Sequence, residues 1–495
     1  RPSGGRPSGG RPMSRVLVVT ADVLRAQLAG PAMRALHIAR HLAGENEVRL
    51  VTTSPYCELQ PDGFTALAAG AEELAEAEAW SEVMVLQGYV TYHHPLLAES
   101  GKVLVFDMYD PLHLETLALT RGMSGPGRDA HVRLSVETLN AQLRRADFLV
   151  CASERQRDLF IGQLCALGRA NPLTYDEDPT LRQLIDVVPF GLPDTGPEHR
   201  RPALRGVVPG IGPADDLLIW AGGVYNWFDP LTLIRAVAGL AQRRPSVRLY
   251  FMGLRHPNPD VPEMTMATEA RALAEELGVA GKHVFFNEGW VDYADRQDYL
   301  LEANLGVTMH FDSAETRFAF RTRALDYLWA ALPVVTTEGD SFAELVEREG
   351  LGLCVPPEDP DALEIALACL LNDRELAEAC RARAAQVRER YRWSAVLEPL
   401  ARFCRQPRRA PDIALPARAG ATAEPAGPKA PQLAGNVGPA EVGPAEVGPA
   451  SMNLAQLAVH HYREGGWAQL ADRATRKARR IVAAKHSGTG QPRAR

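Results

Sequence analysis

Short apolar runs that alternate with helix-like stretches constrain this fold more than any other feature. Residues 16–20 (VLVVT) form a continuous β-branched run, and residues 48–52 (VRLVT) form a second one, as expected of strands buried on both faces of a parallel sheet. An amphipathic stretch with Leu36, Ala39 and Leu42 on one face separates them. This strand–helix–strand alternation predicts right-handed crossovers and a doubly wound α/β sheet.

The alternation occurs twice along the chain, before and after a connector rich in proline and glycine at residues 191–213. Before the connector, we predict further strands at residues 83–86, 103–106, 148–151 and 186–188. After it, we predict strands at residues 217–221, 247–252, 284–286, 305–309 and 333–336, with helices at 265–277 and 299–303. Because ligands bind beyond the carboxyl ends of the strands in such sheets, we expect two Rossmann-like domains that face each other across a cleft.

The chain of 495 residues is too long for one hydrophobic core, so we divide it into six parts. Residues 1–12 repeat RPSGG and are predicted to be a disordered extension, with Met13 as the natural start. We expect an N-terminal domain at residues 13–195, a C-terminal domain at 214–390, a crossover helix at 391–405 that packs back on the first domain, a linker rich in Pro, Gly and Ala at 406–450, and a basic helical tail at 451–495. The linker repeats GPAEV, which cannot hold a helix or strand.

The charge is distributed unevenly between the body and this tail. With 54 basic and 61 acidic residues the net charge is −7, which excludes a general binder of nucleic acid. The tail, however, holds nine Lys/Arg against two acidic residues, a net charge of +7, and leaves −14 for the body. The two parts are therefore expected to meet different partners. We predict peripheral contact of residues 451–495 with an anionic membrane surface, the alternatives being a solvated tail or a protein partner.

Cysteine usage and hydropathy indicate a cytoplasmic chain. The seven cysteines are scattered without a C-x-x-C pair, which argues against a metal ribbon or a secreted disulfide framework. No apolar run approaches the length of a membrane span. His93, His94 and His113 lack metal-ligand spacing. We therefore expect neither a metal nor a cofactor, and a location in the cytoplasm, with possible attachment at the inner face of the membrane.

The most informative stretch is residues 315–335 (ETRFAFRTRALDYLWAALPVV). Read as a helix from about Phe320, it has a core stripe of Leu325, Leu328, Trp329 and Leu332.

The other face of this helix, with Ala319, Thr322, Arg323 and Asp326, is predicted to point toward the cleft. Asp326 can accept hydrogen bonds from two vicinal ribose hydroxyls. Arg317, Arg321 and Arg323 place three guanidinium groups near a helix N-terminus, where a diphosphate is stabilised. The alternative interpretation is a surface ion-pair set among Glu315, Arg323 and Asp326.

Glycines follow the first strand of each half. Gly30 precedes a helix, and Gly222-Gly223 follow the strand after the connector, so both sites allow backbone to approach a phosphate; the alternative is a simple loop turn. The loop 287–293 (NEGWVDY), with Val291, is predicted to flank a nucleobase, although a packed Trp290 is the commoner arrangement.

Carboxylates follow a strand of the first half. Asp107 and Asp110, in the run FDMYDP, are predicted to be exposed to the cleft and to bind hydroxyl groups of a sugar acceptor. An Asp-Pro turn explains Asp110 equally well. Similarly, Ser153 after a later strand is explained as the cap of a helix that carries Glu154.

Taken together, residues 14–404 resemble the GT-B glycosyltransferases, and among them the retaining family 4. The resemblance depends on the two Rossmann-like halves, Gly30-Pro31, Gly222-Gly223 and the run LDYLWAALPVV. The family's signature has two acidic residues, separated by seven other residues, before a small-residue run that ends in Gly-x-Pro-Val-Val. Counted back from Pro333, Asp326 takes the second acidic position, which implies ribose binding. Phe318 falls at the first position, so Glu315, three residues earlier, is the candidate for the sugar-facing catalytic carboxylate.

The chain departs from the family at the donor phosphates. The family places Arg and Lys after the connector strand, in GRL…KG, to neutralise the donor diphosphate. Gly223 and Phe228 take these two positions here, so both charges are missing. A departing nucleoside diphosphate needs charge compensation in a low-dielectric cleft. We predict that Arg317, Arg321 and Arg323 replace the lost charges, with Arg321 and Arg323 acting in catalysis.

The resemblance implies a metal-independent hexosyltransferase that moves a sugar, with retention, from a nucleotide sugar to a glycan, lipid-linked or small-molecule acceptor. Polysaccharide biosynthesis is the expected setting. Two alternatives remain at this point. A catalytically silent GT-B module fits the missing Arg and Lys, and a nucleotide-sugar 2-epimerase shares the fold but needs no acceptor.

Overall fold

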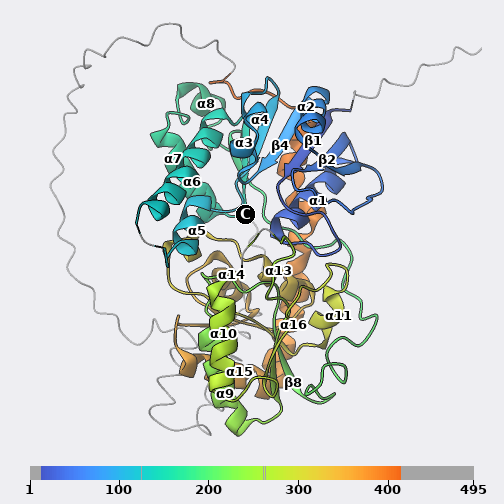
Figure 1. Ribbon diagram of the computed structural model, residues 1–495, viewed down its shortest axis with the longest axis vertical. Helices are drawn as coiled ribbons and strands as arrows, with labels where there is room; N and C mark the ends of the chain where they lie inside the picture. Colours follow the sequence, from blue (N-terminus) through green and yellow to red (C-terminus); the bar gives the residue numbers. More distant parts are fainter. Residues whose placement is uncertain (1–12, 124, 260, 262, 414–495) are drawn as a thin grey trace, which may run out of the picture.

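The computed structural model describes residues 13–123, 125–259, 261 and 263–413. The predicted extension at 1–12, the tail at 451–495 and all but the first residues of the linker lie outside this range. Over the described residues the chain forms two α/β domains stacked one above the other, with the amino-terminal half in the upper part of the view in Figure 1.

The first domain is built on a seven-stranded parallel sheet with the order β3-β2-β1-β4-β5-β6-β7. Its strands are β1 (Arg15–Thr20), β2 (Glu47–Thr52), β3 (Thr65–Ala68), β4 (Val83–Gln87), β5 (Val103–Asp107), β6 (Phe148–Cys151) and β7 (Ile185–Val187). Its helices are α1 (Gly30–Leu42), α2 (Ala71–Trp80), α3 (Val90–His93), α4 (Pro95–Glu99), α5 (Leu112–Leu119), α6 (Pro126–Arg145), α7 (Glu154–Ala166) and α8 (Pro172–Glu177). The central strand β1 is buried from Val16 to Thr20, as the continuous apolar run requires.

The second domain has a six-stranded parallel sheet with the order β10-β9-β8-β11-β12-β13. Its strands are β8 (Asp216–Trp220), β9 (Val247–Phe251), β10 (Val284–Phe286), β11 (Leu305–Thr308), β12 (Val334–Thr337) and β13 (Gly352–Val355). Its helices are α9 (Pro230–Arg243), α10 (Thr265–Glu276), α11 (Arg296–Glu302), α12 (Ala314–Phe318), α13 (Thr322–Trp329), α14 (Ser341–Glu349), α15 (Pro360–Asn372) and α16 (Arg374–Val387). Two doubly wound parallel sheets confirm the predicted fold class.

The chain then returns to the first domain through the 3-10 turn η1 (Arg388–Tyr391), α17 (Trp393–Val396) and α18 (Glu398–Arg405). We expected one crossover helix here, and the structure has two. Pro399 in the first turn of α18 lacks the N–H that would bond to the preceding turn, which explains the break. Trp393 stacks on His37 of α1 with ring centroids 4.8 Å apart, and Phe403 stacks on Phe148 of β6 at 4.5 Å. The crossover therefore completes the core of the first domain.

The two domains touch each other on both sides of the cleft. On one side the Arg155 guanidinium of α7 donates to the carbonyl of Gly339 at 2.7 Å and also pairs with Glu344 of α14. On the other side the amide of Tyr293 donates to the Ala26 carbonyl at 3.0 Å. These contacts hold the domains together, so the site lies in a closed cleft.

Candidate functional site

One pocket gathers most of the predicted donor residues. It is lined from the first domain by the loop after β1 and the first turn of α1, and from the second domain by the loops after β8 and β10 and by α13. The predicted residues that meet there are Gly30, Gly222, Gly223, Val291, Arg323 and Asp326. Since parallel strands present their carboxyl ends at one edge of a sheet, residues far apart in the sequence converge at this point.

Helix α13 presents the cationic side of this pocket because Tyr327 fixes it on the sheet. The Tyr327 hydroxyl donates to the Val307 carbonyl at 2.7 Å and accepts from the Ala221 amide at 2.9 Å. Gly306 makes room for the ring, since a Cβ there would lie 2.4 Å from it. The helix starts at Thr322, two residues later than expected, and a separate short helix, α12, precedes it.

The predicted faces agree with the structure for the residues within α13, whereas Ala319, predicted to face the cleft, is the buried C-cap of α12. Leu325, Leu328 and Trp329 are buried in the core. Thr322, Arg323 and Asp326 line the pocket.

Arg323 is a buried cation at the centre of this pocket. Its Nη2 donates to the Gly223 carbonyl at 2.6 Å, and its Cζ lies 3.9 Å from the ring centroid of Phe228. Its Nη1 is buried without a hydrogen-bond partner among the described residues. Burial lowers the pKa of Arg323 to about 10, so the group stays charged at neutral pH. Gly223 and Phe228 are the two positions at which the family pattern loses its charges, and the guanidinium of Arg323 contacts both.

Arg321 lies beside Arg323 but is already paired. Its Nη1 and Nη2 donate to the two carboxylate oxygens of Glu315 at 2.9 and 2.8 Å, and both side chains are buried. Burial opposes the charge of Arg321, but Glu315 and Asp340 outweigh it and raise the pKa of this arginine. The Arg321 guanidinium also lies 4.9 Å from the Phe228 ring centroid. The structure thus places Glu315 and Arg321 together as a neutral pair, and leaves Arg323 as the cation that can meet an anion.

Arg317 lies apart from this group. Its side chain is exposed on α12 and is not among the residues that line the pocket. Its backbone carbonyl accepts a hydrogen bond from Arg155 at 3.4 Å, across the domain interface.

Asp326 is oriented by a residue that the sequence did not indicate. Its Oδ1 accepts a hydrogen bond from Nε of Arg296 at 3.0 Å. The Arg296 guanidinium lies between the rings of Tyr293, at 3.6 Å, and Trp329, at 4.3 Å. Arg296 is a lone arginine at the start of α11, and no motif surrounds it. Its partner lies 30 residues away, so only the fold shows the pair.

Asp107 differs from expectation. Both of its oxygens accept hydrogen bonds from Arg34 of α1, each at 2.7 Å, and Gln87 donates to Oδ2 at 2.9 Å. The side chains of Arg34 and Asp107 are fully buried. The prediction that Asp107 is exposed to the cleft is therefore wrong. Arg34 lies on the buried face of α1, 73 residues before its partner, which no local pattern could indicate.

Asp110 lies nearer the cleft, next to two further carboxylates. Burial raises the pKa of Asp110 to about 7, and Asp107 and Glu315 add to this effect while Arg34 opposes it. Burial likewise raises the pKa of Glu115 on α5 well above its usual range, with Asp110 and Glu315 adding and Arg321 opposing. Two carboxylates of the first domain therefore face Glu315 of the second. Glu115 was not predicted.

This carboxylate group predicts a pH dependence of stability. Because the pKa of Asp110 is raised in the folded state, the folded chain binds this proton more tightly than the unfolded chain does. The stability that the proton contributes is present below about pH 4 and is lost as the pH rises through about 7. Asp110→Asn should therefore raise the melting temperature relative to the parent protein at pH 8 and change it much less at pH 5. Thermal unfolding at both pH values checks this, and an equal difference at both would contradict it.

Gly30 offers a test of close backbone approach. A Cβ on Gly30 would lie 4.0 Å from the Phe190 ring and from Thr322, so the protein itself accommodates alanine there. We expect Gly30→Ala to leave the melting temperature unchanged, but to weaken nucleotide binding by roughly tenfold if a phosphate packs against this backbone. Calorimetric titration with a nucleoside diphosphate measures the change. Equal affinity in both proteins would show that the glycine serves the turn alone.

The described residues lack two features, a cluster of metal-ligating side chains and a membrane-spanning helix. No group of three or more His, Cys, Asp or Glu side chains in this part of the chain could hold a metal ion. No helix within it is long and apolar enough to cross a membrane. The prediction of a metal-free site stays a prediction.

Comparison with known proteins finds similarity to glycosyltransferases in part of the chain. Residues 215–373 match the family model described as glycosyl transferases group 1. A D-inositol 3-phosphate glycosyltransferase from Jonesia denitrificans is 27% identical over 199 residues, which are 40% of this chain and 44% of that relative. The chain thus aligns with less than half of the length of this curated relative.

Several solved structures share the fold at low sequence identity. Sucrose-phosphate synthase from Thermosynechococcus elongatus superposes with a TM-score of 0.56 at 16% identity, over 79% of this chain and 98% of that one. WaaG, a glycosyltransferase involved in lipopolysaccharide biosynthesis, gives 0.56 at 19% identity, over 79% and 99%. Anabaena Alr3699/HepE in complex with UDP-glucose gives 0.53 at 13% identity, over 79% and 99%.

The predicted resemblance is confirmed at the level of fold and of the second domain. Two facing parallel sheets, the returning crossover and the superpositions agree along the described chain. This chain has the fold of the GT-B glycosyltransferases, and residues 215–373 match the family model of glycosyl transferases group 1.

Proposed function

We propose that this protein is a retaining glycosyltransferase that moves a hexosyl group from a nucleotide sugar to a hydroxyl group of an acceptor without a metal ion. The observation that carries this proposal is the environment of Arg323. Its guanidinium is buried, has one nitrogen without a hydrogen-bond partner among the described residues, and faces two glycines in the donor pocket. A buried cation without an anion is costly, and a donor diphosphate would supply that anion.

The rest of the donor fits around this point. In the proposed complex the diphosphate lies against the backbone of Gly222 and Gly223 and the amino end of α1 at Gly30. Asp326, oriented by Arg296, accepts the ribose hydroxyls. The loop with Val291 flanks the nucleobase. The structural neighbour HepE has been solved with UDP-glucose, which supports a donor of this class.

The proposed reaction breaks the bond between the anomeric carbon and the donor phosphate oxygen, and forms a bond from that carbon to the acceptor oxygen on the same face. The acceptor proton passes to the leaving phosphate oxygen. Arg323 stabilises the charge that develops on this phosphate. The Glu315–Arg321 pair lies beside it, where Glu315 would face the transferred sugar. The closed arrangement of the domains would exclude water and so suppress hydrolysis.

The acceptor is proposed to enter from the first domain. Asp110 and Glu115 are the carboxylates of that domain that approach Glu315, and they suit hydroxyl groups of a glycan, a lipid-linked sugar or a small molecule. Asp107 then acts through Arg34 as a buried support. Arg317 is left out of the proposed phosphate clamp because its side chain is exposed outside the pocket. Polysaccharide biosynthesis in the cytoplasm, with residues 451–495 at an anionic membrane, is proposed from charge and resemblance.

A thermal-shift screen with UDP-, GDP- and dTDP-sugars, followed by mass spectrometry of the products, tests the proposal. We expect at least one nucleotide sugar to raise the melting temperature, and Asp326→Ala to weaken that binding. Transfer should require an acceptor. If no nucleotide sugar stabilises the protein, the chain is a catalytically silent module. If a donor is converted to its epimer without any acceptor, the protein is a 2-epimerase.

A further inference from the structure

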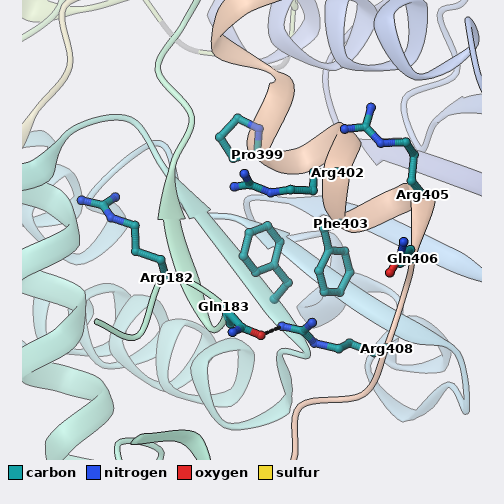
Figure 2. Close-up of a pocket in the computed structure, with 9 residues that line it drawn as sticks. Arg182, Gln183, Pro399, Arg402, Phe403, Arg405, Gln406 and Arg408 are labelled. Atoms are coloured by element: carbon teal, nitrogen blue, oxygen red, sulfur yellow. Dashed lines mark hydrogen bonds between the residues drawn. The ribbon is translucent and has the colours of Figure 1, made fainter. Parts of the chain in front are cut away.

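A second cavity lies at the opposite edge of the first sheet from the cleft. It is formed where α18 and the residues after it meet the amino ends of β6 and β7 (Figure 2). Its volume is about 520 Å³, within the range of about 300–1,000 Å³ that is typical of small-molecule sites. Four arginines line it, and no acidic side chain does; they are Arg182, Arg402, Arg405 and Arg408.

Two of these arginines are held in place by carboxylates outside the cavity. Arg182 donates to Asp186 at 2.6 Å and to Glu154 at 2.7 Å. Arg405 donates to Glu45 at 3.0 Å and also to Glu398. Each of these guanidinium groups therefore uses both terminal nitrogens on partners of the protein, and contributes charge without being free to turn.

The other two arginines, Arg402 and Arg408, leave most of their guanidinium N–H donors unused within the protein. The guanidinium of Arg402 makes no hydrogen bond within the described residues. Its nearest carboxylate, that of Asp186, lies 3.7 Å away. Arg408 donates to the Gln183 amide oxygen, and its nearest carboxylate, Glu177, lies at 3.5 Å. Their side chains are 66% and 46% exposed. A guanidinium group has five N–H donors in a planar fork that matches phosphate oxygens.

The floor and the outer wall of the cavity are already formed. The stacked rings of Phe148 and Phe403, nearly parallel at 10°, line the cavity as its apolar floor. The segment after α18 is fixed to the first domain, because Asp412 accepts from Arg169 at 2.6 Å and the Ala410 amide donates to Asp147 at 3.1 Å. The backbone of the site is therefore preformed, and a ligand would have to order mainly the side chains of Arg402 and Arg408.

We propose that this cavity binds a small phosphorylated ligand. Its phosphoryl group meets Arg402 and Arg408, while the body of the ligand packs over the Phe148–Phe403 stack. Five carboxylates outside the cavity offset the formal charge of the four arginines, so the proposed binding depends on the N–H donors that Arg402 and Arg408 do not use within the protein; the carboxylates are Glu45, Glu154, Glu177, Asp186 and Glu398. The site uses no residue of the donor pocket, so it does not depend on the proposed function.

The site has a structural consequence for the whole chain. Arg182 belongs to the first domain, whereas Arg402, Arg405 and Arg408 belong to the segment that returns from the second domain. A ligand between them joins the two, so it strengthens the attachment of the crossover to the first sheet. Such a ligand would stabilise the native chain by RT ln(1 + c/Kd), where c is its free concentration, so the stabilisation grows with the logarithm of this concentration once the site is mostly filled.

Calorimetric titration of the full chain with glucose 1-phosphate, and separately with inorganic phosphate, tests the proposal at constant ionic strength. The test variant is Arg402→Ala with Arg408→Ala. The matched control is Arg374→Ala with Arg390→Ala, which also removes two exposed arginines with ion-pair partners. Arg323→Met is included to remove binding in the donor pocket. We expect at least tenfold weaker binding in the test variant only.

The two ligands distinguish the source of the phosphate. Tighter binding of glucose 1-phosphate than of inorganic phosphate assigns the cavity to a phosphorylated sugar-sized molecule, and equal binding assigns it to free phosphate. The proposal is overturned if neither ligand binds, if the test variant binds as tightly as the control, or if sulfate at the same ionic strength competes equally well. Circular dichroism of the test variant must match that of the control, since both substitutions are at exposed side chains.

Discussion

Replacing Arg323 by methionine is expected to raise the activation free energy of sugar transfer by about 2–4 kcal/mol, which lowers kcat/KM roughly 30- to 900-fold. Methionine keeps the apolar contacts with Trp220 and Phe228 but removes the charge. Arg321 is neutralised by Glu315, and Arg296 is paired with Asp326. Among the described residues that line the pocket, no second arginine without a carboxylate partner can therefore replace Arg323. Steady-state kinetics with the best donor from the thermal-shift screen measures the loss.

A matched control lies six residues away. Arg317→Met removes the same charge from an exposed position outside the pocket, and we expect a change in kcat/KM of less than threefold. Arg323→Lys should fall between the two, because it keeps a charge but lacks the fork that reaches the Gly223 carbonyl. Full activity of Arg323→Met, or an equal loss in Arg317→Met, would refute the relocated phosphate clamp.

Breaking the Arg34–Asp107 pair is expected to lower the free energy of unfolding by about 3–5 kcal/mol, the usual cost of leaving one buried charge without its partner. Asp107→Asn preserves the shape of the side chain but removes the negative charge opposite Arg34. Arg34→Met removes the positive charge and leaves the Asp107 carboxylate without its partner. Arg34 also donates to the Val188 and Pro189 carbonyls. Arg34→Met therefore also removes the contact between α1 and the residues after β7. Denaturant unfolding measures the change.

The same experiment decides what Asp107 does. If it bound the acceptor directly, Asp107→Asn would raise the KM for the acceptor and leave stability nearly unchanged. Arg15→Met serves as the control, because its ion pair with Glu82 is exposed and is expected to contribute at most about 1 kcal/mol. A loss in Asp107→Asn no larger than in this control would contradict the structural role.

The fold was predictable because its signals are periodic and local. Buried parallel strands need unbroken apolar runs, and such runs marked β1 and β8 to within a residue. The strands that escaped prediction are β3 and β13, which are short and partly exposed. They are placed by pairing with β2 and β12 rather than by their own composition. Propensity alone does not identify such edge strands.

The site was predictable where glycines follow strands and where α13 is amphipathic. Gly222, Gly223 and Asp326 meet in one pocket for that reason. What the sequence could not show is which charges are already paired. Glu315 is neutralised by Arg321, six residues away in the sequence, and Asp107 is neutralised by Arg34, 73 residues away. Pairing depends on tertiary contacts, so a motif names candidate ions but not which of them remain available to a substrate.

The returning crossover determines how the two halves can be exchanged between related enzymes. The first domain is assembled from two stretches of chain, since Trp393 stacks on His37 and Phe403 stacks on Phe148, each from more than 250 residues away. A fragment cut at the connector would leave these rings uncovered and prone to aggregate. A chimera should instead treat residues 214–390 as an insert within an otherwise intact host, because both of its ends then join segments of the same first-domain scaffold. The second domain would then be exchanged as one unit, without exposing the core of the first.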